Sequence, residues 1–154
     1  MTKVPANFLK TILVGTDFSV CAARAFSFAV SLAHSQGAKI RILHVLMEPV
    51  QALDVAAALP YPDMEVRQSW ESAAQGRLDR EIRAAEKRGV KATGELKWGR
   101  PSDVLVESAV AMKASLLVVG AHGRSALEKF LLGSTAERVV RHSPVPVLTV
   151  REKK

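Results

Sequence analysis

Aromatic residues are scarce in this sequence: Phe, Trp and Tyr together make up 5% of its 154 residues. Aliphatic side chains must therefore fill the core, and a hydrophobic content of 48% is sufficient for one. The scarcity also leaves few rings on which bases could stack, which argues against nucleic acid as the main ligand. We expect a single domain over residues 1–154, because this length leaves no room for two domains of ordinary size.

The sequence has one cysteine, Cys21, so it cannot form an internal disulfide, and nothing in it indicates an oxidising compartment. The four histidines are scattered and no Cys/His cluster has zinc-site spacing, so we expect no metal ligands among the side chains. No stretch approaches the roughly 20 apolar residues of a membrane span, and the first ten residues lack the apolar run of a signal peptide. We therefore expect a cytoplasmic protein that does not bind membranes.

Negative charge is in deficit, because 22 Lys and Arg face 15 Asp and Glu, which gives a formal net charge of +7. The segment from Lys113 to Lys154 holds eight of the bases and three of the acids, so +5 of the excess lies there. This distribution suits an anionic ligand, and it is also compatible with a solvated basic tail. Charge alone does not select between the two interpretations.

Apolar runs and helical periodicity alternate along the chain, which predicts strands that alternate with helices. Five segments are typical of strands: 11–15, 38–46, 90–98, 115–120 and 145–150. Five helices are expected: from the N-cap Ser19 to Gly37, over a long stretch ended by Gly89, from Pro101 to about Lys113, over 125–132 and over 134–141. In the long helix, Arg77 and Glu81 lie off the apolar stripe. The connection over 47–63 is long, which is typical of functional lids and of mobile loops.

This alternation predicts an α/β fold: a single open five-stranded parallel sheet with helices on both faces, Rossmann-like in architecture. Segments 11–15 and 115–120 are apolar throughout and belong at the centre of the sheet. Segment 90–98 is polar, with Gly94 inside it, and segment 145–150 contains Pro146, so both belong at edges. The order 3-2-1-4-5 meets these conditions. It places a switch point between the first and fourth strands, and ligands of such sheets bind there, beyond the carboxyl ends of the strands.

Glycines gather directly after the fourth expected strand. The loop begins GAHG at residues 120–123, and after nine further residues the sequence continues GST at 133–135. Glycine lets a backbone approach an anion without obstruction by a Cβ, and it supplies unusual dihedral angles. The second segment opens a helix, whose free N–H groups and positive dipole end attract phosphate. Ser134 and Thr135 add hydroxyl donors and Arg124 adds positive charge, so the loop predicts a phosphate site.

Each of these residues also has a structural interpretation. Gly120 and Gly123 suit a strand-to-helix turn, Ser134 suits a helix N-cap, and Asp17, just past the first strand, suits a cap of the first helix. A carboxylate at Asp17 is equally suited to ribose, because it accepts hydrogen bonds from two hydroxyl groups. His122 is interpreted as a loop residue. With no Ser/His/Asp set and no pair of carboxylates at acid–base spacing, we expect no catalytic residue.

The sequence contains neither a P-loop nor a Gly-x-Gly-x-x-Gly fingerprint after the first strand. The spacing of the glycines instead resembles the nucleotide-binding signature of ATP-binding universal stress proteins. In that signature two residues separate the first glycine from the second, and nine residues separate the second from a final Gly-Ser/Thr. Further segments are also similar to that family, so that the resemblance spans residues 10–150: Thr16-Asp17-x-Ser19, His44-Val45, Gly99-x-Pro101 and SPVPVL at 143–148. Gly15 and Ser115 depart from residues that are frequent in the family, at positions that do not contact phosphate.

The resemblance implies roles for the matching residues. Asp17 would hold the ribose hydroxyls, and the backbone of Val45 would hydrogen-bond adenine. The phosphates would lie on Gly120, Gly123, Arg124, Gly133, Ser134 and Thr135. Family members commonly dimerise through the last strand, which implies a homodimer paired through residues 145–150. An apolar edge strand with unsatisfied backbone groups favours such pairing, although Pro146 removes one donor.

We therefore expect a universal-stress-protein-like domain that binds an adenine nucleotide, ATP, with Mg²⁺ held only through the phosphates. It would act as a regulatory or stress-response module with little or no turnover. Two alternatives stay open: a slow ATP hydrolase, and a stress-response interaction protein that does not use nucleotide. An enzyme of the same superfamily would be expected to add a substrate domain or further catalytic signatures, and the sequence shows neither.

Overall fold

Five parallel strands form one sheet in the computed structural model, which describes residues 7–47, 64–123 and 132–152. The strand order is β3-β2-β1-β4-β5, and all four pairings are parallel. The strands are β1 Thr11–Thr16, β2 Lys39–Leu46, β3 Ala92–Trp98, β4 Leu116–Gly120 and β5 Val147–Val150. The predicted α/β fold and its strand order are confirmed.

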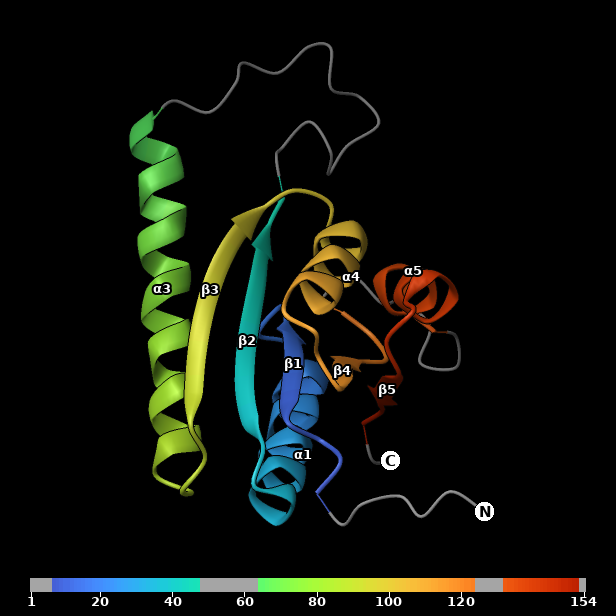
Figure 1. Cartoon of the computed structure of the whole chain (residues 1–154). Helices are drawn as coiled ribbons and strands as arrows, with labels where there is room; N and C mark the ends of the chain where they lie inside the picture. Colours follow the sequence, from blue (N-terminus) through green and yellow to red (C-terminus); the bar gives the residue numbers. More distant parts are fainter. Residues whose placement is uncertain (1–6, 48–63, 124–131, 153–154) are drawn as a thin grey trace.

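Helices cover both faces of the sheet (Figure 1). The described helices are α1 Val20–Gln36, α3 Met64–Glu86, α4 Pro101–Ala111 and α5 Ser134–His142. Helices α1 and α3 pack on one face, and α4 and α5 pack on the other. Right-handed crossovers require this arrangement, because the chain moves outward from β1 to β3 and then returns past β1 to β4 and β5. The direction of winding reverses between β1 and β4.

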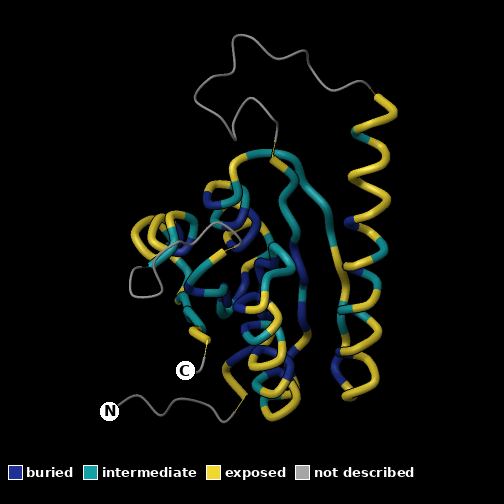
Figure 2. Tube along the Cα trace, turned by 180° about the vertical axis from the view of Figure 1, so that it is seen from behind, coloured by how far each residue is buried: buried dark blue, intermediate teal, exposed yellow. Residues whose placement is uncertain are grey.

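Alternation along the strands divides the core into two layers. Ile12 and Val14 of β1 face α1 and α3, whereas Leu13 faces α4 and α5. All six residues of β1 are buried, and Figure 2 shows the central strands buried and the outer surface of α3 exposed. No Phe, Trp or Tyr belongs to the buried core of the described chain, so the core is aliphatic, as the composition predicts.

The predicted ends of the first helix are confirmed. Ser19 is the N-cap of α1, and its Oγ accepts a hydrogen bond from the Ala22 N–H at 3.1 Å. Gly37 ends the helix with φ of 62°, a left-handed conformation that glycine adopts without strain. Pro101 lies in the first turn of α4, where the missing N–H has no partner to lose.

Other boundaries differ from the prediction for local reasons. Strand β3 begins at Ala92 and not at Val90, because the Val90 N–H still bonds the Ala85 carbonyl at the end of α3. Helix α4 ends at Ala111 and not near Lys113, which has a positive φ of 51°. The expected helix over 125–132 lies outside the described residues except for Leu132, which is not helical, and the 47–63 connection lies outside them from residue 48 on.

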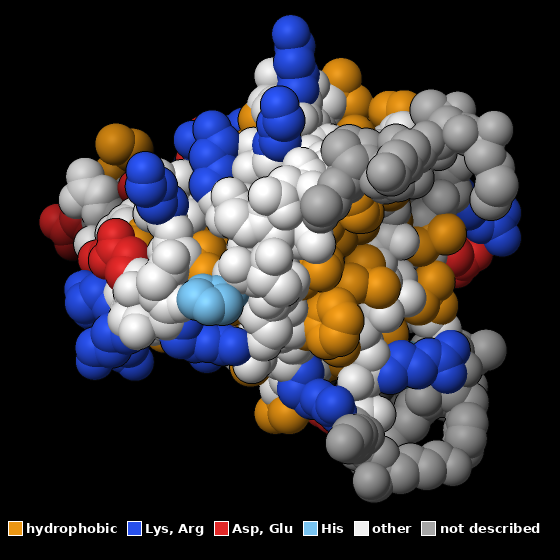
Figure 3. Space-filling view, turned by 60° about the horizontal axis from the view of Figure 1, so that its bottom comes forward, with side chains coloured by type: hydrophobic (Ala, Val, Ile, Leu, Met, Phe, Trp, Pro, Cys, Tyr) orange, Lys and Arg blue, Asp and Glu red, His pale blue; other side chains and the backbone are white. Residues whose placement is uncertain are grey.

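Basic side chains are spread widely over the surface. Figure 3, which brings the amino ends of the strands towards the viewer, shows many Lys and Arg side chains and few Asp and Glu around a hydrophobic area. This face is remote from the carboxyl edge of the sheet, so the net charge of +7 does not by itself locate a site. None of the described helices is long and apolar enough to cross a membrane.

Candidate functional site

The loops after β1 and β4 meet at the carboxyl edge of the sheet. Asp17 directly follows β1, and Gly123 lies three residues after the end of β4. Asp17 Oδ2 lies 2.9 Å from the position that a Cβ atom on Gly123 would occupy. The carboxylate therefore packs against the Cα of Gly123, and a side chain at position 123 would push it out of its present place. The structure thus brings together the first two elements of the predicted site.

The start of α5 joins this pair. The Gly133 N–H donates a hydrogen bond to the Ala121 carbonyl at 2.8 Å, which fixes the helix start on the loop after β4. Gly133, not Ser134, is the N-cap of α5, and no side chain caps the helix there. Ser134 and Thr135 lie in the first turn, whose N–H groups have no intrahelical acceptor. Such a helix start favours an anion.

Close approach, and not unusual backbone geometry, explains the glycines of the site. Gly120, Gly123 and Gly133 all have ordinary negative or extended φ, contrary to the expectation of unusual dihedrals. A Cβ on Gly133 would lie 3.2 Å from the Ala121 carbonyl oxygen. A Cβ on Gly120 would lie 3.1 Å from the Ala22 nitrogen at the start of α1. Gly120 and Gly133 thus let two backbone segments pack more closely than a side chain would allow, and Gly123 gives the same room to the Asp17 carboxylate.

A tight turn orients Asp17. Its Oδ1 accepts a hydrogen bond from the Ser19 N–H at 3.0 Å, and Phe18 between them has a positive φ of 60°. Thr16 Oγ1 accepts from the Phe18 N–H at 3.1 Å. Because Ser19 caps α1, Asp17 is not needed as the helix cap, and its second oxygen is left on the side of Gly123.

Val45 lies beside this turn on β2. The last register pair between β1 and β2 joins Thr16 to His44, so Val45 is the first residue of β2 beyond the end of β1. The Lys39 N–H donates to the Lys10 carbonyl, so the backbone groups of Lys39 point towards β1. Because backbone direction alternates along a parallel strand, every second residue after Lys39 points the same way, and Val45 is one of them. The Val45 carbonyl therefore faces the space past the end of β1, as hydrogen bonding to a base requires.

Two predicted loop residues have different outcomes. His122 lies in the loop after β4, where its Nδ1 is buried and has no hydrogen-bond partner in the part of the chain that the structure describes. A buried ring nitrogen of this kind adds a polar group beside Gly123. Arg124, the predicted source of positive charge, lies outside the described residues.

Sequence reasoning missed two side chains of α3 that contact the Asp17 turn. Glu81 Oε1 accepts a hydrogen bond from Thr16 Oγ1 at 3.3 Å, and Arg77 Nη2 donates to the Phe18 carbonyl at 3.3 Å. Burial raises the pKa of Glu81 to about 7, and the nearby Asp17 acts in the same direction, against the Thr16 hydrogen bond and the charge of Arg77. Their place off the apolar stripe was visible in the sequence, but the rotation of α3 about its axis was not.

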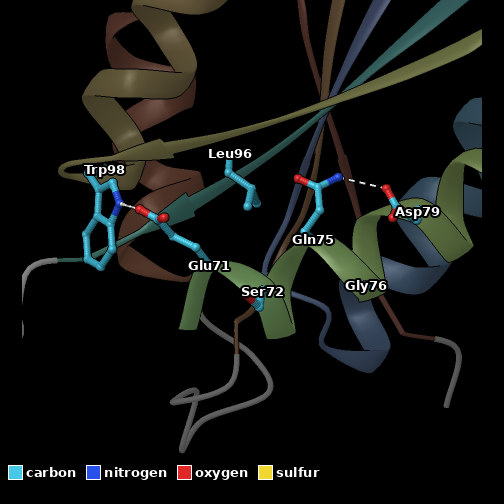
Figure 4. Close-up of a pocket in the computed structure, with 7 residues that line it drawn as sticks. All are labelled: Glu71, Ser72, Gln75, Gly76, Asp79, Leu96 and Trp98. Atoms are coloured by element: carbon cyan, nitrogen blue, oxygen red, sulfur yellow. Dashed lines mark hydrogen bonds between the residues drawn. The ribbon is translucent and has the colours of Figure 1, made fainter. Parts of the chain in front are cut away.

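A hollow of about 690 Å³ lies elsewhere, between α3 and β3 (Figure 4). Its polar groups bond one another: Trp98 Nε1 donates to Glu71 Oε1 at 2.6 Å, and Gln75 Nε2 donates to Asp79 Oδ1 at 2.7 Å. With two carboxylates in its lining, the hollow would repel a polyphosphate. The switch point is therefore the better candidate for an anionic ligand.

Metal ligation by protein side chains has no candidate in residues 7–47, 64–123 and 132–152. No group of three or more His, Cys, Asp or Glu side chains lies close enough there to hold an ion. A cation at this site would need ligands from elsewhere, and the oxygens of a bound phosphate chain are suitable donors.

The chain belongs to the universal stress protein family, whose model matches residues 9–151. Universal stress protein MJ0531 of Methanocaldococcus jannaschii is 33% identical to it, over 96% of this chain and 85% of that relative. Universal stress protein YxiE of Bacillus subtilis is also 33% identical, over 92% of this chain and 98% of that relative. These relatives span nearly the same length as this chain.

Solved structures agree with this assignment. The structure of the hypothetical protein MJ0577 superposes with a TM-score of 0.81 at 26% identity, and covers 96% of this chain and 99% of that one. A universal stress protein solved in complex with cAMP has a TM-score of 0.70 at 29% identity, over 93% of this chain and 97% of that one.

Proposed function

We propose that this chain is a nucleotide-binding domain, over residues 1–154, that binds ATP at the carboxyl edge of the sheet between β1 and β4. The observation that carries the proposal is the packing of the Asp17 carboxylate against Gly123, with Gly133 and the start of α5 hydrogen-bonded to the same loop. A carboxylate for ribose hydroxyls and a helix start for phosphates then lie side by side. In this proposal the backbone of Val45 hydrogen-bonds adenine, and Arg124 adds positive charge. The phosphates lie on Gly120, Gly123, Gly133, Ser134 and Thr135.

A similar protein supports the choice of an adenine nucleotide. The ligand of the universal stress protein solved with cAMP contains an adenine, a ribose and a phosphate, the three groups that we propose this site binds. For ATP, Mg²⁺ would be held through the phosphate oxygens. We propose a regulatory or stress-response role with little or no turnover, in the cytoplasm, and a homodimer that pairs through β5.

Calorimetry on Asp17→Ala tests the site. Removing the carboxylate should weaken ATP binding at least about tenfold, the cost of leaving two ribose hydroxyls without their charged acceptor. Asp79→Ala is the matched control, because it removes a carboxylate from the hollow at α3 and should leave the affinity unchanged. Equal ATP affinity in the Asp17 variant, or a change in the Asp79 variant alone, would contradict the site.

Two further measurements define the function. Mass spectrometry of ligand released from freshly purified protein should identify an adenine nucleotide. Steady-state phosphate release should stay well below about 1 s⁻¹, since even that rate needs positioned acid–base groups or a metal. Faster release that Asp17→Ala abolishes would favour the slow hydrolase instead.

A further inference from the structure

Side chains of helix α3 contact the turn of residues 16–19 that contains Asp17, and what we infer from these contacts rests on the proposed function. The Arg77 guanidinium lies 4.5 Å from the centre of the Phe18 ring, and Nη2 donates to the Phe18 carbonyl at 3.3 Å. One side chain thus holds both the ring and the backbone of Phe18. It comes from an element 59 residues further along the chain.

Phe18 is the strained residue of the turn. Its φ of 60° is uncommon for a residue with a large side chain, so other contacts must hold it there. The ring contacts Arg77 and also His44, whose ring centre lies 4.5 Å away at an interplanar angle of 36°. His44 Nδ1 in turn lies 2.7 Å from the Thr16 carbonyl oxygen, and it must be the protonated donor because a carbonyl only accepts.

The conformation of Phe18 determines where Asp17 points. Asp17 precedes Phe18 directly, and its Oδ1 receives the Ser19 N–H, which follows Phe18. If Phe18 relaxed to negative φ, the Ser19 N–H would turn away, and the carboxylate beside Gly123 would lose the hydrogen bond that its Oδ1 accepts. Glu81 supports the turn at its other end through Thr16 Oγ1.

We propose that Arg77 is a positioning residue for the ribose-binding carboxylate: by holding Phe18 in its left-handed conformation, it keeps Asp17 aimed at the ligand. The competing role for an arginine near an anionic ligand is direct attraction of the phosphates. The two roles differ in which part of the ligand must be present for an Arg77 substitution to weaken binding. Positioning acts through the ribose hydroxyls, and direct attraction acts through the phosphates.

A ligand series separates these roles. Arg77→Ala should weaken the binding of adenosine and of ATP by the same factor, about fivefold. This factor corresponds to the loss of one exposed cation–π contact and its hydrogen bond. It should leave 2′,3′-dideoxy-ATP unaffected, and it should have no further effect in an Asp17→Ala background. Arg80→Ala, an exposed arginine on the same helix, is the matched control and should change nothing. A loss that grows from adenosine to ATP, or that persists for the dideoxy nucleotide, overturns the proposal.

Amide hydrogen exchange in the ligand-free protein gives a readout that does not depend on nucleotide. Arg77→Ala should speed exchange of the Ser19 amide severalfold, because its bond to Asp17 Oδ1 opens more often. The Gly133 amide, bonded to Ala121 on the far side of the site, should be unchanged. Unchanged Ser19 exchange overturns the positioning role. If the parent protein binds no ATP, the proposed function fails, and this measurement still decides whether Arg77 holds the turn.

Discussion

At the scale of single residues, the carboxyl edge of the sheet carries two carboxyl groups in different environments. Asp17 faces Gly123 and accepts the Ser19 N–H. Glu81 lies behind the turn, where one oxygen accepts from Thr16 and Oε2 is buried without a hydrogen-bond partner among the described residues. An ionised Glu81 would have poor solvation and a negative neighbour, which is why its pKa is raised to about 7. The first group suits ligand binding, and the second couples the turn to pH.

The raised pKa of Glu81 predicts that the stabilisation from this residue is lost as pH rises. The folded chain binds the proton of Glu81 more tightly than the unfolded chain, so the contribution of Glu81 to the free energy of unfolding decreases between the ordinary pKa of 4.5 and about 7. Solvent access limits the total loss from this group to roughly 2 kcal/mol. Glu81→Gln keeps an acceptor for Thr16 and cannot ionise, so it should be more stable than the parent at pH 8 and little different at pH 5.

Urea unfolding at pH 5, 6, 7 and 8 measures this difference between parent and variant. Glu86→Gln serves as the control, because it neutralises an exposed carboxylate of the same helix. The stability difference between the parent and the Glu81 variant should grow across this range, while that for the Glu86 variant stays flat. A constant difference for Glu81 would show that its carboxyl is already ionised at pH 5.

The residues of the candidate site differ in whether the nearby sequence is enough to predict their positions. Asp17 and the glycines could be predicted, because a strand followed by a polar turn and a spaced glycine pattern are features of contiguous sequence. Arg77 and Glu81 could not, because their contacts depend on how far α3 rotates against β1. One part of the argument for the glycines was wrong, since Gly120, Gly123 and Gly133 have no positive φ and instead lie close to neighbouring atoms.

At the scale of elements, the packing of α3 on β3 depends on one missing side chain. A Cβ on Gly94 would lie 2.6 Å from Leu78 Cγ and 2.9 Å from Ile82 Cδ1. Leu78 is fully buried, so it cannot move aside. Gly94→Ala should therefore destabilise the fold by about 1–3 kcal/mol through overpacking. Thermal unfolding measures the effect as a lower Tm.

Gly76 on the same helix provides the opposite case. A Cβ there would meet nothing within 4 Å, and the residue lies inside α3. Gly76→Ala should raise stability by about 0.5–1 kcal/mol, because alanine is the better helix former. A lower Tm for Gly76→Ala would contradict the helix-propensity argument, and an unchanged Tm for Gly94→Ala would contradict the crowding at Leu78.

Element order was more predictable than element ends. The apolar composition of β1 and β4 and the polar character of β3 identified the centre and one edge, because burial on both faces demands continuous apolar sequence. The ends depend on single hydrogen bonds and dihedral angles, such as that of Val90 to Ala85. Such contacts leave little trace in composition or periodicity.

At the scale of the whole molecule, β5 is an edge strand, paired with β4 alone among the described strands. The Pro146 carbonyl accepts from the Leu117 N–H, and the Val150 carbonyl accepts from the Ala121 N–H. Alternation in a parallel ladder then turns the backbone groups of residues 146, 148 and 150 towards β4, and those of Val147 and Thr149 outward. The N–H that proline lacks would therefore face β4, so Pro146 removes no donor from the outer edge of β5.

This geometry sharpens the prediction of a homodimer. Two copies related by a two-fold axis can pair their β5 strands antiparallel, which satisfies the outward groups of Val147 and Thr149 in both. Thr149→Pro removes an outward donor and spares the ladder to β4, so it should shift the protein towards monomer, whereas Thr149→Ser should remain a dimer. Proline is tolerated at sheet edges, and an unchanged circular dichroism spectrum would show that the fold is kept. Light scattering at micromolar concentration measures the mass: a parent protein that is monomeric, or a proline variant that stays dimeric, would mean that β5 is not the interface.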